Sequence, residues 1–393
     1  MKWVFPGVTA GITIGRGHTG FRNMQQSTRT IDGVDVHHLS APEADRLATA
    51  EKWELFGSYL RQQGRGAMAF GTLQPGMGYL WAGGVGFLAY RKRGGVAFVL
   101  GDPVCKPADA PMMVRWAEQW LGRCAFFQLS RAVAYPLAPM GYYVNSYGVE
   151  IVIDLPSWNL AGPVRKNLRA ACRQCGGYDI VEIRPDSEAY RETHHVSREW
   201  LDTRRVSGRE VSFLCRPTSM DTALFVRTFV ARDSAGRIQG FVHYDPLHEN
   251  GRIFGYVWQA ARCRTGTPAR LGMAINCRAA DVFRDEGLEV LSMGLCPQHR
   301  LDDSLEINSP FTTTIFTYGF QRWNWIYGLK GIARHKEEYG GRAVPYYFAS
   351  RHQYPFRELM NIYPACGVSV TRQALRALWR KFGPAGGRRE ISP

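Results

Sequence analysis

The sequence predicts an α/β protein built from two successive mixed layers of strands and helices. Two observations lead to this fold class. Apolar runs rich in strand formers alternate with amphipathic helical segments along the 393 residues. The order helix, antiparallel strands, strand–helix–strand then occurs twice, although no residue-level repeat accompanies the second copy. A chain of 393 residues fits two domains or one large one, and its 45% of hydrophobic residues suffices for a packed core.

The segment 251–297 shows the strand–helix–strand pattern most clearly. Strand formers fill 253–258, a polar loop with two arginines follows, a helix is predicted over 269–285, and 290–293 is typical of a buried strand. The loop and the first helical turn bring backbone amides and arginines together, which suits an anionic ligand such as a phosphate. Since any strand–helix–strand unit shares this outline, a purely structural interpretation stays open.

The other elements are predicted from the same patterns. In the first layer we expect strands at 34–39, 67–73, 78–90, 95–100, 124–129 and 149–155, and helices at 41–60 and 110–121. Ser40 and Glu43 resemble a capping box at the start of the first helix, and 91–95 is expected to be a hairpin turn. In the second layer we expect a strand at 181–183, a helix at 186–201, a hairpin of 223–233 with 238–245, and a last strand at 343–349.

These elements divide the chain into four parts. Residues 1–30 are rich in Gly and Thr and are predicted to be a flexible N-terminal segment. Residues 31–160 form the first predicted domain, and residues 161–350 form a second domain that carries the catalytic cleft. Residues 351–393 are expected to hold a basic amphipathic helix, at 370–382, and a tail. That helix would dock on a membrane surface or a nucleic acid, or cap the core of the domain.

The net charge favours negatively charged partners. Lys and Arg number 49 against 34 Asp and Glu, which gives a formal charge of +15. This balance favours nucleic acid, anionic lipid head groups or phosphorylated substrates, although a basic surface can also serve solubility alone. Arg165, Lys166, Arg169 and Arg173 recur at steps of three and four residues on a predicted helix, with no acidic residue among them. This basic stripe is a candidate contact for a polyanion, and a solvated helix face is the alternative.

Cysteine usage and hydropathy argue against several classes. The nine cysteines are scattered, and the one close pair, Cys172 and Cys175, lacks the second pair that a zinc site requires. We therefore expect reduced thiols and no bound metal. No apolar run reaches the about 18 residues that span a bilayer, and the first residues lack the apolar core of a signal peptide. The expected location is the cytoplasm, with peripheral contact to the inner membrane as a further option.

Four stretches, in this order, resemble the soluble catalytic domain of the phosphatidylglycerol lysyl- and alanyl-transferases. They are GFLAY at 86–90 with VLGDPV at 99–104, GPVRKNLR at 162–169, MGLCP at 293–297, and YGLKGIARHK at 327–336 with PYYF at 345–348. The resemblance implies two tandem acetyltransferase-like (GNAT) domains with mixed sheets. It also implies transfer of an aminoacyl group from charged tRNA, as co-substrate and without another cofactor, to an acceptor hydroxyl or amine. The acceptor would be a phosphatidylglycerol-type lipid or a small natural-product intermediate, as in soluble relatives such as the valanimycin seryltransferase.

The resemblance also assigns roles to residues. Lys336 occupies the family's lysine position before the last strand, where its ammonium would stabilise the oxyanion or protonate the departing ribose oxygen. Arg262 matches an arginine that contacts phosphate, and Tyr327 matches an aromatic residue that lines the same end of the cleft. Substrate binding is assigned to five further residues: Gln259, Arg264, Arg334, Asp302 and Asp303. The basic stripe Arg165, Lys166, Arg169 and Arg173 would meet the tRNA backbone.

Two positions depart from the family pattern. Gln259 stands where the family has an aspartate three residues before the arginine, and an amide cannot remove a proton. Glu338 replaces the second lysine of the Lys-x-Lys pattern that begins at Lys336.

Two alternative functions therefore stay open. An acyl-CoA-dependent N-acyltransferase would share the fold, but Arg262 and Arg264 stand four and two residues before Gly266, which does not match the Arg/Gln-x-x-Gly-x-Gly/Ala pyrophosphate loop. A non-catalytic tRNA- or membrane-binding protein is the other alternative.

Overall fold

The computed structural model of the chain describes residues 26–185, 187–203, 210–218, 220, 225–302, 307–322 and 328–368. Most of the predicted N-terminal segment and the predicted helix at 370–382 lie outside these residues. So do two predicted site residues, Tyr327 and Asp303. Within the described ranges, no helix is both long enough and apolar enough to cross a bilayer.

The first half is an antiparallel meander that ends in one strand–helix–strand unit. Its antiparallel strands are β1 (Ser27–Ile31), β2 (Val34–Leu39), β3 (Gly78–Ala82), β4 (Gly86–Arg93) and β5 (Val96–Leu100), with the short β6 (Val104–Cys105) beside β4. From β5, α3 (Ala110–Leu121) leads to β7 (Cys124–Ser130), which runs parallel to β5. The remaining helices are α1 (Ala41–Ala44), α2 (Thr49–Gln63), α4 (Arg131–Ala134) and the 3-10 helices η2 (Phe70–Leu73), η3 (Pro107–Asp109) and η4 (Tyr135–Met140).

The second half has the same plan. Its antiparallel strands are β9 (Asp179–Ile183), β10 (Arg227–Arg232), β11 (Ile238–Glu249) and β12 (Arg252–Cys263). From β12, α7 (Leu271–Asp285) leads to β13 (Val290–Pro297), which runs parallel to β12. The helices α5 (Lys166–Gln174) and α6 (Glu188–Asp202) flank β9 in the sequence, and α8 (Pro310–Arg322) and α9 (Leu329–Glu337) follow β13.

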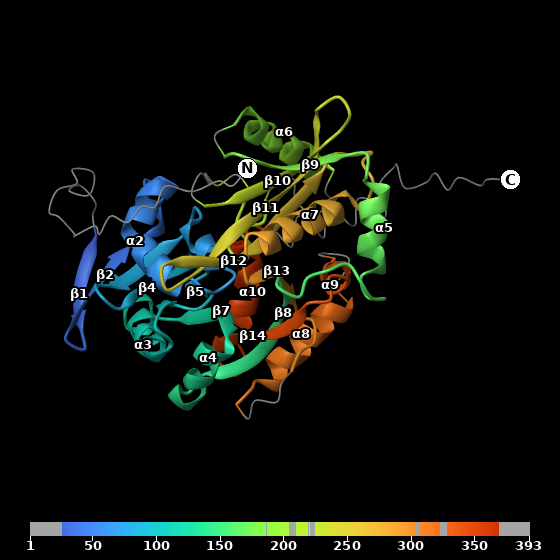
Figure 1. Cartoon of the computed structure of the whole chain (residues 1–393). Coiled ribbons are helices and arrows are strands. Elements are labelled where there is room, and N and C mark those ends of the chain that lie inside the picture. The colour runs from blue at the N-terminus through green and yellow to red at the C-terminus, as the bar shows by residue number, and fades with distance from the viewer. Residues whose placement is uncertain are drawn as a thin grey trace, which may run out of the picture.

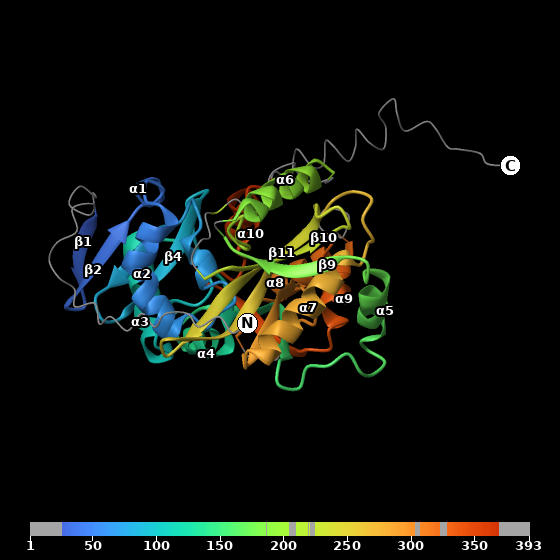
Figure 2. The same cartoon turned by 45° about the horizontal axis from the view of Figure 1, so that its top comes forward.

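Two long strands join the halves into one sheet. β14 (Arg342–Ser350) lies between β7 and β8 (Tyr143–Asp154) and pairs antiparallel with both, and β8 pairs with β13. Figure 1 shows β14 and β8 in the middle of the molecule, between β7 and β13. The described strands thus form a single sheet of 14 strands. Figure 2 shows that α5 lies at the far end of the second half from β1 and β2.

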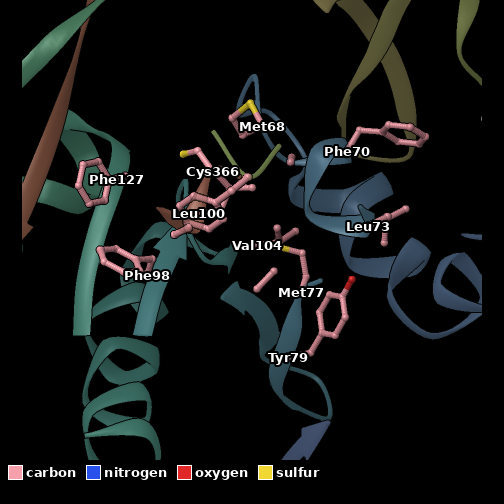
Figure 3. Close-up of a cluster of buried hydrophobic side chains, with 14 of the residues drawn as sticks. Met68, Phe70, Leu73, Met77, Tyr79, Phe98, Leu100, Val104, Phe127 and Cys366 are labelled. Atoms are coloured by element: carbon pink, nitrogen blue, oxygen red, sulfur yellow. The ribbon is translucent and has the colours of Figure 1, made fainter. Parts of the chain in front are cut away.

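The core lies on both faces of the central strands. In β5 every residue is buried, and Val96, Phe98 and Leu100 face one apolar cluster while Ala97 and Val99 face another. This alternation is the period of two that a strand imposes when both faces of the sheet are covered. Figure 3 shows part of the first cluster, where Phe98 lies near Leu100 and Phe127. The last described helix, α10 (Phe356–Ala365), contacts β4 and β5.

Three predicted elements of the first half are wrong in detail. The helix predicted at 41–60 is divided into α1 and α2, and between them Asp45 accepts a hydrogen bond from the backbone N of Gly76 at 2.7 Å. The strand predicted at 67–73 is the 3-10 helix η2, because local bonds such as Thr72 Oγ1 to the carbonyl of Ala69 satisfy its backbone. The strand predicted at 78–90 is the hairpin of β3 and β4, whose turn contains Gly84 at φ +75°.

The connecting segment 210–218 ties the second half to the first. Gln74 exchanges two hydrogen bonds with the backbone of Phe213, at 2.7 and 3.1 Å. At the other end of the segment, Arg216 and Asp245 form a salt bridge at 2.6 Å in which both side chains are fully buried. Such a pair is stable only as a pair, because either charge alone would be left without water or a partner.

We therefore expect Asp245→Asn to destabilise the protein by about 3–5 kcal/mol, the usual cost of removing one partner of a buried ion pair. The free energy of unfolding from urea titration measures this cost. Glu289→Gln is the matched control, because the Arg252–Glu289 pair is 58% and 50% exposed and its loss should cost at most about 1 kcal/mol. Equal effects of the two substitutions would contradict the structural role of Asp245.

Candidate active site

The two parallel strands of the second half separate soon after they meet. β12 and β13 pair only from Gly255 to Val257 and from Val290 to Ser292. Beyond this point the pairing of β13 with β8 shifts register, and Gly294 takes φ +73°. The diverging strands leave a split between β12 and β13, where backbone groups of the two strands no longer form hydrogen bonds with each other.

The side chain of Lys336, from α9, occupies this split. Its Nζ donates a hydrogen bond to the carbonyl of Leu295 at 2.8 Å and lies 4.9 Å from the centre of the Trp258 ring. A Cβ at Gly294 would stand 3.3 Å from the same Nζ, so the glycine leaves the room that the ammonium needs. Lys336 is only 5% exposed.

The surroundings of Lys336 lower the pKa of its ammonium group. Burial lowers the pKa of Lys336 to about 8, while Cys296 and Glu150 raise it by smaller amounts. Glu150 is itself buried and accepts a hydrogen bond from the hydroxyl of Ser292. The ammonium form predominates at neutral pH, yet its pKa is close enough to neutrality for proton transfer.

Arg262, near the end of β12, is held in place from two sides. Its Nη2 donates to Glu210 at 2.8 Å, and its guanidinium lies 4.1 Å from the centre of the Trp200 ring. Both Arg262 and Lys336 lower the pKa of Cys215, although burial is the larger effect and raises that pKa to about 11. The charges of both predicted catalytic cations therefore act on the same thiol.

Gln259 occupies a β-bulge of β12, where the register with β11 shifts. Its Nε2 donates a hydrogen bond to the carbonyl of Arg216 at 2.8 Å. An aspartate at this position would have no proton to donate, so the glutamine anchors the connecting segment 210–218 to β12. The predicted role in substrate binding stays a prediction.

The other predicted substrate-binding residues are spread over the surface. Arg264 donates to the carbonyl of Ile238 at 2.8 Å and forms salt bridges with Glu192 and Glu199, so its charge is largely balanced inside the protein. Arg334 and Asp302 are exposed. The structure gathers Lys336, Arg262 and Gln259 around β12. Arg264 follows directly after β12 and shares the lining of one cavity with Trp200, whose ring lies against Arg262.

The basic stripe splits into two pairs. Arg165 donates to the carbonyls of Asn159 and Tyr339, at 2.8 and 3.2 Å, and Arg169 donates to those of Leu160 and Gly162, at 2.6 and 2.7 Å. These two arginines therefore hold the loop that precedes α5. The other two, Lys166 and Arg173, are exposed on α5.

A cavity of about 320 Å³ lies in the first half, at the position that corresponds to the split. There β5 and β7 pair in parallel as far as Leu100 and Phe127, and the next residue, Gln128, takes φ +62° at a shift in register. The cavity is lined by residues 63, 65–69, 101–105, 107, 128, 130, 132, 133 and 346. We call it the first cavity.

A second cavity, of about 360 Å³, lies at the N-terminus of α7. It is lined by residues 200, 203, 261, 263–265, 267–269, 272, 273 and 335. His335 neighbours Lys336 in the sequence, and its ring lies 6.0 Å from that of Trp258. Among the residues that the structure describes, none lines both cavities.

Sequence reasoning missed several residues of this region. Asp102 and Tyr346, which line the first cavity, lie in the VLGDPV and PYYF stretches but received no role. Glu150 and Trp258 lie inside strands, where a buried acid and a tryptophan give no signal beyond packing. Among the described residues, no group of three His, Cys, Asp or Glu side chains is placed to hold a metal ion.

Comparisons with known proteins identify relatives of this chain. The family described as "Phosphatidylglycerol lysyltransferase, C-terminal" matches residues 57–350. Phosphatidylglycerol lysyltransferases of Bacillus subtilis and Staphylococcus epidermidis are 23% and 22% identical over 318 and 285 residues, which cover 77% and 70% of this chain. Those residues make up 35% and 32% of the relatives, so the chain spans about a third of their length.

Solved structures confirm the predicted fold of two tandem GNAT-like halves with mixed strands. L-PGS from Bacillus licheniformis matches 80% of this chain and 96% of its own with a TM-score of 0.68 at 20% identity. The C-terminal domain of a putative lysylphosphatidylglycerol synthetase from Agrobacterium fabrum gives 0.66, 20% identity and coverage of 80% and 95%. The chain belongs to the family of phosphatidylglycerol lysyltransferase C-terminal domains.

Proposed function

We propose that this chain is an aminoacyltransferase that moves an amino acid from charged tRNA to a hydroxyl of an acceptor. The observation that carries the proposal is the buried ammonium of Lys336, held in the split between β12 and β13. The names of the relatives favour lysine as the amino acid and phosphatidylglycerol as the acceptor. A small hydroxyl compound is the alternative acceptor, and the cytoplasmic face of the membrane is the expected place of action.

The reaction needs positioned charge and no covalent intermediate. The acceptor oxygen attacks the ester carbonyl carbon, the bond from that carbon to the ribose oxygen breaks, and the proton of the acceptor hydroxyl ends on the ribose oxygen. An ammonium carries three donors, so the bond of Lys336 to Leu295 leaves others for the developing oxyanion. The lowered pKa lets Lys336 give a proton to the ribose oxygen and recover it from the acceptor.

The second cavity is the proposed site for the end of the charged tRNA. It contains the rings of Trp200 and His335, on which a base can stack, and it opens at the N-terminus of α7, which attracts phosphate. The side chains of Lys166 and Arg173 are exposed on α5, which packs against α7. No further cofactor is required, since the tRNA ester is already activated.

We expect Lys336→Met to lower kcat by about 10²–10³, the usual cost of losing an oxyanion donor. The assay follows label from a total tRNA pool charged with labelled amino acids into phosphatidylglycerol vesicles or into water-soluble products, with and without RNase. Lys330→Met is the control, because Lys330 lies exposed on the same helix. If the parent protein shows no RNase-sensitive transfer with any amino acid, the proposal fails and acyl-CoA donors should be tested.

The rate should fall as the pH rises through about 8, because the ammonium of Lys336 is then lost. Stability should change in the opposite direction. The unfolded chain keeps this proton up to the usual pKa of 10.5, so between pH 8 and 10.5 the contribution of Lys336 to the free energy of unfolding rises with pH. Urea titrations across this window should therefore show the free energy of unfolding of the parent rise relative to that of Lys336→Met at the same pH.

Exposed and internally bonded members of the basic stripe should behave differently. Replacing Lys166 and Arg173 together by alanine should weaken tRNA binding. The slope of log K for tRNA binding against log salt concentration should become shallower by about 1.5–2, because two phosphate contacts are lost. Arg169→Ala should instead lower the free energy of unfolding, since its bonds go to the protein backbone. Filter binding across a salt series measures the first effect, and an unchanged slope would remove α5 from the tRNA contact.

A further inference from the structure

We propose that the first cavity binds the acceptor as a neutral polyol, such as a glycerol group, through Asp102 and Tyr346. The inference rests on the proposed function, since it assigns a site to the second substrate of the same reaction. The glycerol group can belong to a lipid head group or to a free small molecule, and its chemistry is the same in both.

The two halves of the fold correspond at the place where their parallel strands stop pairing. Each half has one parallel pair of strands that ends at a bulge with a positive φ, at Gln128 in β7 and at Gly294 in β13. In the second half the space beyond the pair holds Lys336. In the first half the same place is the first cavity, and β14 adds Tyr346 to its wall by pairing with Ser130 of β7.

Gln128, in the wall of the first cavity, has a strained backbone conformation. A left-handed conformation is uncommon for a residue with a side chain, and such strain gathers at functional sites. The Nε2 of Gln128 donates to the carbonyl of Leu214 at 3.0 Å, which fixes the strained residue against the connecting segment 210–218. The wall of the first cavity is therefore rigid before any ligand arrives.

The lining of the first cavity contains the carboxylate of Asp102. Asp102 Oδ1 accepts a hydrogen bond from the backbone N of Ser130 at 2.8 Å. A carboxylate accepts about four hydrogen bonds, so Asp102 has capacity for hydroxyl donors. Burial raises the pKa of Asp102 to about 6, and this unfavourable burial of charge would be offset by a bound hydroxyl.

The charges of its lining make the first cavity unfavourable for an anionic group. Among the described lining residues, the one cationic side chain is that of Arg65, which forms a salt bridge with Glu249 at 2.6 Å and is 64% exposed. A phosphate in the cavity would meet the carboxylate of Asp102 without a cation to balance it. The hydroxyls of a glycerol group fit instead, because a polyol can donate to Asp102 and accept from the second N–H of the Gln128 amide.

Side-chain contacts connect the wall of the first cavity to Lys336. Tyr346 hydrogen-bonds Glu150, whose charge acts on Lys336. On the other side, Ala67 of the cavity wall packs against the cluster that contains Val257. A Cβ at Gly294 would lie 3.9 Å from Val257 and 3.3 Å from Lys336 Nζ. Two chains of contacts therefore connect the first cavity to Lys336, which is not itself among the residues that line the cavity.

Two substitutions test the site without touching Lys336. Asp102→Asn keeps an oxygen for the backbone N of Ser130 and removes the charge, and Ala67→Leu fills space without removing a hydrogen bond. Both should raise the KM for phosphatidylglycerol vesicles at least tenfold, while the Kd for charged tRNA changes less than twofold. Matched controls are Asp154→Asn and Ala108→Leu, which are exposed and outside the lining. Unchanged KM in both test variants, with active parent, overturns this inference alone.

A second measurement does not depend on activity. Hydrogen exchange of the parent is followed with water-soluble dihexanoyl phosphatidylglycerol in one arm and with glycerol in the other. Slower exchange of amides in 101–105 and at Ser130, absent in Ala67→Leu, supports the site, and the two arms tell a lipid source from a free one. No slowing in either arm overturns the inference. Absence of RNase-sensitive transfer by the parent would instead reject the proposed function, whatever the exchange shows.

Discussion

The pairing of β14 with both β7 and β8 is the constraint on which the rest of the structure depends. A strand from the end of the described chain closes the middle of the sheet, so the two GNAT-like halves share one hydrogen-bonded ladder. The same strand carries Tyr346, and its partner β8 carries Glu150. The regions around the first cavity and around Lys336 are thereby held at a fixed distance by backbone hydrogen bonds, which two domains joined by a linker would lack.

Much of the fold could be predicted from the sequence because its strongest signals are local. The strand–helix–strand segment at 251–297 became β12, α7 and β13, since apolar periodicity and strand propensity agree there. Prediction failed where tertiary contacts override local preference. The apolar run 67–73 resembles a strand, yet it folds as η2 because Gln74 bonds both to Gly71 and to the distant Phe213.

The candidate site was less predictable, and for a different reason. Lys336 was identified only by resemblance, because nothing local distinguishes a lysine that will be buried from an exposed one. Arg264 stands in a loop that suits phosphate, but its partners Glu192 and Glu199 come from α6, more than sixty residues away in the sequence. The division of the basic stripe likewise depends on carbonyls of the preceding loop, which periodicity does not reveal.

The separation of the two cavities has a consequence for kinetic order. If the donor and the acceptor bind in the two cavities as proposed, neither has to leave before the other arrives, because no described residue lines both cavities. Donor and acceptor can therefore occupy the enzyme together, and double-reciprocal plots at several fixed acceptor concentrations should intersect, whereas a carrier of a covalent intermediate gives parallel lines. Under this proposal, the two substrates would enter the enzyme through different cavities.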